Sequence, residues 1–120
     1  MTHSLTRADL AAFTGTERWY RHPLNRRVLF TDGVRHVAEA GGAYWLLDEI
    51  ALAQLHVPGV ARELFQVWRP TVRPDRSASL KCGDGNGVTV WTKPIPYTDF
   101  PLIGIELYLS NNTILLPGEY

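Results

Sequence analysis

The segment from Gly41 to Ala53 is predicted to form a helix that is too apolar for an ordinary surface position. At about 100° per residue, one broad face, extended to position 57, carries only aliphatic side chains: Leu46, Leu47, Ile50, Ala53 and Val57. The other face interleaves polar and apolar side chains: Asp48, Glu49, His56, Trp45 and Leu52. Two interpretations of this second face stay open: the rest of the domain covers it, or Trp45 is an exposed anchor for a partner. In either case the rest of the chain must bury most of this helix.

The length and the cysteine count indicate one domain in a reducing compartment. A chain of 120 residues can bury a core without metals or disulfides, so we expect a single domain over 1–120. Its single cysteine, Cys82, excludes an intramolecular disulfide, and no cysteine and histidine residues have zinc-site spacing. The N-terminus lacks the apolar core of a signal peptide, and no apolar run reaches the length of a membrane span. These features predict a cytoplasmic protein.

The first half of the chain has helical patterns, which predict a mainly helical region over 1–57. Thr6 and Asp9 form a predicted capping box for a short helix that continues to about Phe13. Asp32 is the expected N-cap of a helix over 33–40, and the pair at 41–42 permits a sharp turn into the central helix. The dipeptide at 58–59 is expected to end that central helix.

From Leu64 onward the periodicity changes to two residues, which predicts a mainly β region over 63–117. The glycine-rich segment 83–87 favours a hairpin between strands near 77–82 and 88–92. Asn111 and Asn112 favour a second hairpin between 105–110 and 113–116. The whole pattern predicts an α+β fold, with an antiparallel sheet of four or five strands packed against two or three helices.

The residues that could carry chemistry all have ordinary structural interpretations. Asp32 and His36 lie four residues apart, where a carboxylate could orient an imidazole, but the favoured interpretation is an aspartate N-cap beside an exposed histidine. Asp48 and His56 are two helical turns apart, which is unsuitable for a tight pair of metal ligands. The segment 84–87 resembles the start of a calcium loop, but its twelfth position is Ile95. We therefore predict no catalytic residue, no metal site and no cofactor.

The predicted interaction site combines arginines with aromatic residues. Between positions 18 and 27 lie Arg18, Trp19, Tyr20, Arg21, Arg26 and Arg27. Such a mixture can bind nucleic acid, but the chain has twelve basic and twelve acidic residues and therefore no overall attraction to phosphates. The same arginines suit an acidic protein surface. We predict that these six residues contact a partner, together with Trp45, Asp48 and Glu49 of the central helix.

Several strings resemble an uncharacterised family of small bacterial proteins whose function is catalogued as unknown. They include the segments 13–17, 19–22, 31–34, 41–51, 84–87, 98–102 and 114–120. The resemblance covers nearly the whole chain after Phe13 and transfers no catalytic residue. It implies proteins that are often carried by plasmids, prophages and other mobile elements, a context that suits an inhibitor of a host defence system.

Three functions are compatible with these observations. The first is a non-enzymatic protein-interaction module, such as an inhibitor of a host defence system encoded by a mobile element and resembling an anti-CRISPR protein. The second is a small-molecule binder or hydrolase with a pocket between the central helix and the sheet. The third is a nucleic-acid-binding module that uses the segment 18–27. We expect the partner to be another protein, with nucleic acid as the alternative and no contact with a membrane.

Overall fold

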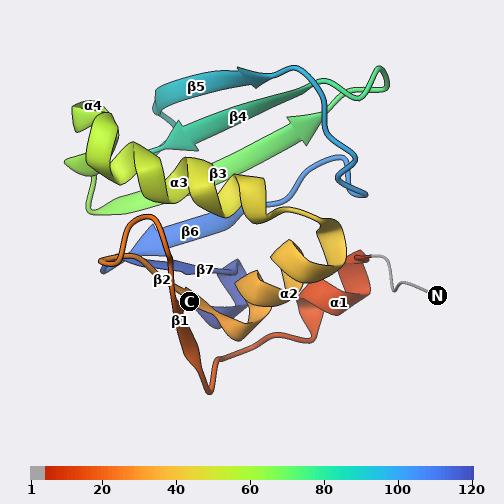
Figure 1. The fold of residues 1–120 in the computed structure, drawn as a ribbon, viewed down its shortest axis with the longest axis horizontal. Coiled ribbons are helices and arrows are strands. Elements are labelled where there is room, and N and C mark those ends of the chain that lie inside the picture. The colour runs from red at the N-terminus through yellow and green to blue at the C-terminus, as the bar shows by residue number, and fades with distance from the viewer. Residues whose placement is uncertain (1–4) are drawn as a thin grey trace.

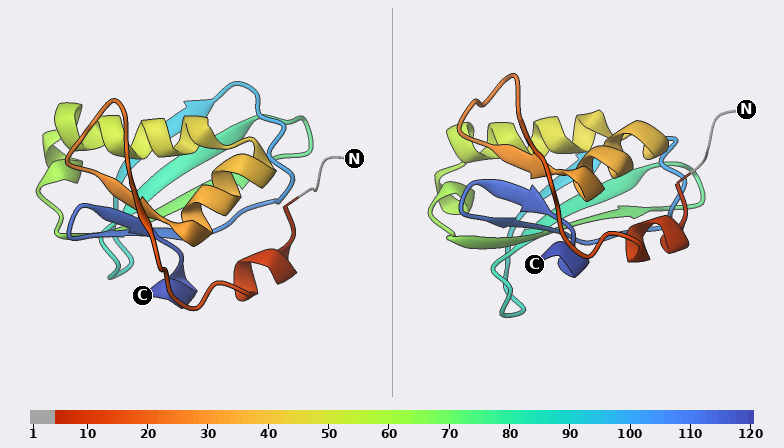
Figure 2. Two further views of the ribbon diagram at one scale, coloured as in Figure 1. Left: turned by 60° about the horizontal axis from the view of Figure 1, so that its bottom comes forward. Right: turned by 90° about the horizontal axis from the view of Figure 1, so that it is seen from below.

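The computed structural model describes residues 5–120, which form one mixed sheet with helical elements on both of its sides (Figure 1 and Figure 2). The helical elements are α1 (Arg7–Ala11), α2 (Asp32–Gly41), α3 (Tyr44–His56), α4 (Pro58–Ala61) and the 3-10 turn η1 (Pro117–Glu119). The strands are β1 (Trp19–Arg21), β2 (Leu29–Thr31), β3 (Phe65–Val72), β4 (Ala78–Gly83), β5 (Thr89–Ile95), β6 (Leu107–Ser110) and β7 (Thr113–Leu115). Within this range no helix is long and apolar enough to cross a bilayer.

The sheet has the strand order β1-β2-β7-β6-β3-β4-β5, so β1 and β5 form its two edges. All neighbouring strands are antiparallel except β2 and β7, which are parallel. The α+β class is confirmed, but the prediction of four or five antiparallel strands and two or three helices is an undercount. β1 and β2 come from the half predicted to be helical. Each strand has three residues, which is too short for a two-residue period to be visible in the sequence.

The main core lies between the sheet and the pair α2 and α3, which cover one face (Figure 2). The fully buried side chains in this layer include Leu46, Leu47, Ile50, Trp68, Leu80 and Leu107. Figure 2 shows α1 and η1 on the opposite side of the sheet. We call that opposite side the α1 face, because α1 lies on it and neither long helix covers it. The sequence therefore predicted the burial of the central helix correctly, and the structure adds a second, less covered face.

The helix ends follow the capping rules with one shift. Thr6 and Asp9 form the predicted capping box at α1. At α2 the N-cap is Thr31, whose hydroxyl accepts the N–H of Val34 at 3.3 Å, whereas the predicted N-cap Asp32 is the first helical residue. Gly42 ends α2 with φ of 60°, a left-handed conformation that glycine adopts without strain. Two predicted helices therefore begin and end within a residue or two of their expected positions.

Both predicted hairpins are present. β4 and β5 flank the glycine-rich loop, while β6 and β7 flank Asn111 and Asn112, whose φ angles are 51° and 58°. In contrast, the dipeptide at 58–59 does not simply end the central helix. Pro58 begins the short helix α4, as a proline can at a first helical position.

A carboxylate fastens the C-terminal turn to the start of α2. Glu119 accepts hydrogen bonds from the Thr31 hydroxyl at 2.6 Å, from the Leu116 N–H at 2.9 Å and from the Gly33 N–H at 3.2 Å. The first N–H groups of a helix have no intrahelical acceptor, so a carboxylate is well placed there. This contact holds η1 beside β2 and against the α1 face of the sheet.

We expect Cys82 to be chemically quiet in the native protein. Its side chain is fully buried on β4, and burial raises the pKa of its thiol to about 12. A thiol reagent should therefore label it only after denaturant is added, because the reactive species is the thiolate. Labelling of the native protein at the rate of an exposed thiol would contradict this placement.

The same shift makes stability depend on pH. Between the ordinary thiol pKa of 9.0 and about 12, the unfolded chain loses a proton that the folded chain keeps. The free energy of unfolding should therefore fall as the pH rises through this interval. A Cys82→Ala variant lacks this titration, so its stability should fall less over the same range in matched denaturation experiments.

Candidate functional site

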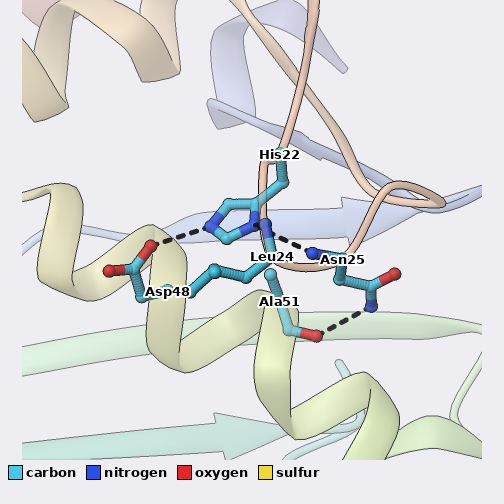
Figure 3. A network of polar contacts seen from close by, with 5 residues as sticks. All are labelled: His22, Leu24, Asn25, Asp48 and Ala51. Atoms are coloured by element: carbon cyan, nitrogen blue, oxygen red, sulfur yellow. Dashed lines mark hydrogen bonds and ion pairs between the residues drawn. The ribbon is translucent and has the colours of Figure 1, made fainter.

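A histidine and an aspartate connect the loop between β1 and β2 to α3 (Figure 3). His22 is buried, and its Nε2 lies 2.9 Å from Oδ1 of Asp48. The N–H groups of Leu24 and Asn25 donate to Nδ1 at 3.1 and 3.3 Å. The Asn25 amide in turn donates to the carbonyl of Ala51 at 2.9 Å. These contacts hold the loop on the surface of α3.

The hydrogen bonds assign a structural role to this pair. Because Nδ1 of His22 accepts two backbone N–H groups, the ring proton is placed on Nε2 and is donated to Asp48. Both ring nitrogens are therefore occupied inside the protein. A general base needs a nitrogen that can reach a substrate proton, so the arrangement resembles a catalytic dyad only in its composition.

The predicted partner-binding residues of α3 are held by internal contacts. Asp48 binds His22, and both carboxylate oxygens of Glu49 accept from Nζ of Lys93 on β5, at 2.7 and 2.9 Å. Trp45 is half-buried and packs against the core. The loop and β5 thus engage the second face of the central helix, which favours the interpretation that the domain covers this face.

The aromatic residues of β1 have opposite environments. The ring of Tyr20 stacks on Phe30 at a centroid distance of 5.6 Å, and the guanidinium of Arg35 lies 4.8 Å from the Tyr20 centroid. Because side chains alternate along a strand, Trp19 and Arg21 project from the α1 face instead. Trp19 is 57% exposed. Of the two aromatic residues predicted to bind a partner from the segment 18–27, Trp19 is exposed and Tyr20 packs against Phe30 and Arg35.

Asp32 holds the start of β1 in place. Its Oδ2 accepts the N–H groups of Glu17 and Arg18 at 3.0 and 3.3 Å, and its Oδ1 accepts the Tyr20 hydroxyl at 3.1 Å. These bonds, that from Glu17 above all, keep the pKa of the Asp32 carboxyl below its usual value. Asp32 does not orient His36, although their spacing in the sequence allowed it. Instead, Nε2 of His36 lies 3.5 Å from Oδ2 of Asp9.

Five exposed residues define a basic surface on this hairpin, which we call the hairpin patch. It consists of Arg18, Trp19, Arg21, Arg26 and Arg27. Among residues 5–120, none of these four arginines forms an ion pair with a carboxylate, whereas Arg35, Arg69 and Lys93 do. The guanidinium of Arg21 donates to the carbonyl of Arg26, which holds that side chain across the hairpin. The structure thus leaves five of the six residues predicted in this segment exposed.

The α1 face carries an aromatic cluster that no pattern in the sequence indicated. The rings of Phe65, Tyr108 and Tyr120 meet in pairs, with centroid distances of 5.0, 5.4 and 5.7 Å. Tyr120 is 72% exposed, and the loop after β4 reaches this cluster, since a Cβ on Gly85 would lie 2.9 Å from the Phe65 ring. Three separate segments form the cluster, so only the alternation in β3 and β6 could have indicated which of its rings share a face.

A groove of about 680 Å³ lies on the same side of the sheet, between α1, the segment 103–106 and η1. Its walls are mainly apolar and include Leu10, Phe13 and Ile103. The Arg69–Glu106 ion pair adds charge at the groove, with 3.1 Å between Nη2 and Oε1. The predicted small-molecule pocket was placed between the central helix and the sheet, but there the buried core side chains fill the interface.

Fold and site together define a small α+β protein with an exposed basic hairpin on an edge strand. Within residues 5–120, no group of three or more histidine, cysteine or acidic residues is arranged to hold a metal ion. The chain belongs to a family of unknown function, DUF6876, which matches residues 4–120. No curated protein and no solved structure matches it.

Proposed function

We propose that the protein is a non-enzymatic interaction module that binds an acidic surface of another protein through the hairpin patch. The observation that carries the proposal is the set of four exposed arginines without a carboxylate partner in the described chain, beside the exposed Trp19. Some exposed cations elsewhere, such as Arg35 and Arg69, pair with carboxylates. Within residues 5–120 others, such as Arg62 and Lys81, do not, but they lie on separate segments, whereas the four arginines share one hairpin. Guanidinium groups can bind carboxylates through two parallel hydrogen bonds, so an acidic partner suits them.

Internal hydrogen bonds also hold the hairpin in place, which favours binding with little reorganisation. His22 and Asn25 attach its loop to α3, while Asp32 holds its first residues. Side chains that are already positioned lose less conformational entropy on binding. Arginine and tryptophan are the residue types that most often dominate protein interfaces. Both are present on this one short strand and its flanking loop.

An acidic protein surface agrees better with the geometry than a nucleic acid does. Stacking on bases requires free aromatic faces. Because Phe30 and Arg35 cover the Tyr20 ring, Trp19 is the one aromatic residue of the segment 18–27 with a free face. The chain also has equal numbers of basic and acidic residues, so its net charge does not favour a polyanion. Nucleic-acid binding is therefore the competing outcome of the charge-reversal experiment.

Charge reversal at the hairpin tests the proposal. A variant with Arg21, Arg26 and Arg27 replaced by glutamate should keep its melting temperature, because these side chains are exposed. It should bind a partner captured by the wild-type protein at least about tenfold more weakly, since like charges now face the partner's carboxylates. The matched control reverses Arg62, Arg73 and Lys81, which are exposed on other segments, and should bind like the wild type.

Two results would contradict the proposal. Equal loss in both triple variants would mean that net charge, and not the hairpin patch, governs binding. A partner that proves to be nucleic acid would show an affinity that falls by orders of magnitude between ~50 and ~200 mM salt. The narrower prediction, an inhibitor of a host defence system, depends on which protein is captured and is tested by its identity.

A further inference from the structure

The edge of β1 next to the hairpin patch has backbone groups that point away from the sheet. The His22 N–H donates to the Val28 carbonyl across the hairpin, and the Leu29 N–H donates to Asn112 on the other side of β2. Because N–H and C=O groups alternate in direction along a strand, those of Tyr20 face β2. The amides and carbonyls of Trp19 and Arg21 then face outward. Among the described residues 5–120, β1 pairs with β2 alone, so this edge has no further strand on it.

The opposite edge of the sheet is protected. β5 contains Pro94, and Pro96 follows directly after its end. Proline has no N–H, so it cannot donate to an added strand, and it is a common way to block an exposed edge. β1 contains no proline. The two edges of this sheet therefore differ, and β1 is the one that can accept a further strand.

The side chains at the open edge indicate the chemistry of such a strand. Trp19 and Arg21 both project from the α1 face, and they precede and follow the inward-facing Tyr20 along β1. A strand that pairs with β1 would place alternate side chains directly beside Trp19 and Arg21. The Arg21 guanidinium is held by the Arg26 carbonyl and has five N–H donors in all, so some are free to bind a carboxylate.

From these observations we infer that the partner contributes an extended segment with acidic side chains at alternate positions, which adds to the sheet beside β1. Main-chain hydrogen bonds to Trp19 and Arg21 supply affinity, and the arginines of the hairpin patch select for carboxylates. This inference rests on the proposed function, because it specifies how the hairpin patch engages its partner. It differs from simple charge attraction in requiring the backbone N–H groups at the edge.

The backbone can be tested separately from the charge at position 21. The probe is a fluorescein-labelled peptide of alternating glutamate and valine, with affinity measured by anisotropy. Arg21→Ala removes the charge and keeps the outward N–H, whereas Arg21→Pro removes both without breaking a bond to β2. We expect Arg21→Ala to weaken binding, and Arg21→Pro to weaken it a further fivefold or more, about the effect of one lost hydrogen bond. A peptide with lysine in place of glutamate should not bind.

Hydrogen exchange on the unmodified protein gives a second measurement that does not depend on the proline variant. Saturating peptide should slow exchange of the Trp19 and Arg21 amides at least about tenfold, while the Tyr20 amide, already bonded to β2, changes little. Strand addition is overturned if both amides exchange freely in the complex, or if Arg21→Pro binds as well as Arg21→Ala. In either case the proposed function stands when the triple charge reversal still abolishes binding. It fails with the inference when neither Arg21→Ala nor the triple variant weakens binding. An acidic peptide that does not bind at all overturns strand addition alone, because a folded acidic surface can still bind the hairpin patch.

Discussion

Replacement of Gln66 by leucine is expected to lower the free energy of unfolding by roughly 3 kcal/mol or more, because it leaves several buried polar groups unpaired. Gln66 is fully buried on β3, and its amide exchanges two hydrogen bonds of 2.8 Å with Gln54 of α3. Its oxygen also accepts the Trp68 indole N–H at 2.9 Å, and its nitrogen donates to the Val60 carbonyl at 2.8 Å. Leucine has a similar size but satisfies none of these groups.

The matched control is Gln54→Leu. Gln54 is only half-buried, so water can replace part of what it loses, and we expect less than half the effect. Since the two residues share their bonds, the double variant should cost less than the sum of the single variants. Urea denaturation of all four proteins measures these differences. A Gln66→Leu protein within about 0.5 kcal/mol of the wild type would show that this network contributes little.

Replacement of His22 by alanine is expected to destabilise the protein by about 2–4 kcal/mol and to release the hairpin. The change removes the bond to Asp48 and leaves the N–H groups of Leu24 and Asn25 without their acceptor. In this variant the hairpin amides should exchange faster than in the wild type, whereas those of β3 and β4 should change less. One such hairpin amide is that of position 22, which donates to the Val28 carbonyl. Binding through the hairpin patch should weaken as well, because its arginines are then less well positioned.

The Asp48→Asn variant is the control for this prediction. An asparagine oxygen can still accept the proton of His22, so the contact persists without the negative charge. We expect a loss of stability well below that of His22→Ala. If His22→Ala melts like the wild type and its hairpin amides exchange at the wild-type rate, the proposed attachment of the loop to α3 is wrong.

Features encoded by neighbouring residues could be predicted from the sequence. The capping box at Thr6 and Asp9 and the hairpin turn at Asn111 and Asn112 depend on side chains and backbone angles within a few positions. The burial of Cys82 follows from its alternation with nearby apolar residues on one strand. Such local signals were sufficient for the α+β class and for most of β3 to β7.

Contacts between distant residues could not be predicted in the same way. The parallel pairing of β2 with β7 joins segments from opposite ends of the chain, so no local pattern indicates it. The aromatic cluster at Phe65, Tyr108 and Tyr120 likewise draws on three separate segments. Their proximity depends on strand order and register, which are set by packing of the complete core.

The candidate site shows the same division. The sequence by itself determined that cations and aromatic side chains are concentrated between positions 18 and 27, and that the central helix must be largely buried. Only the tertiary structure decided that Tyr20 packs inward while Trp19 stays open, and that Asp48 and Glu49 bind His22 and Lys93. The physical reason is that composition specifies which contacts a side chain can make, whereas its orientation and nearest partners depend on the fold around it.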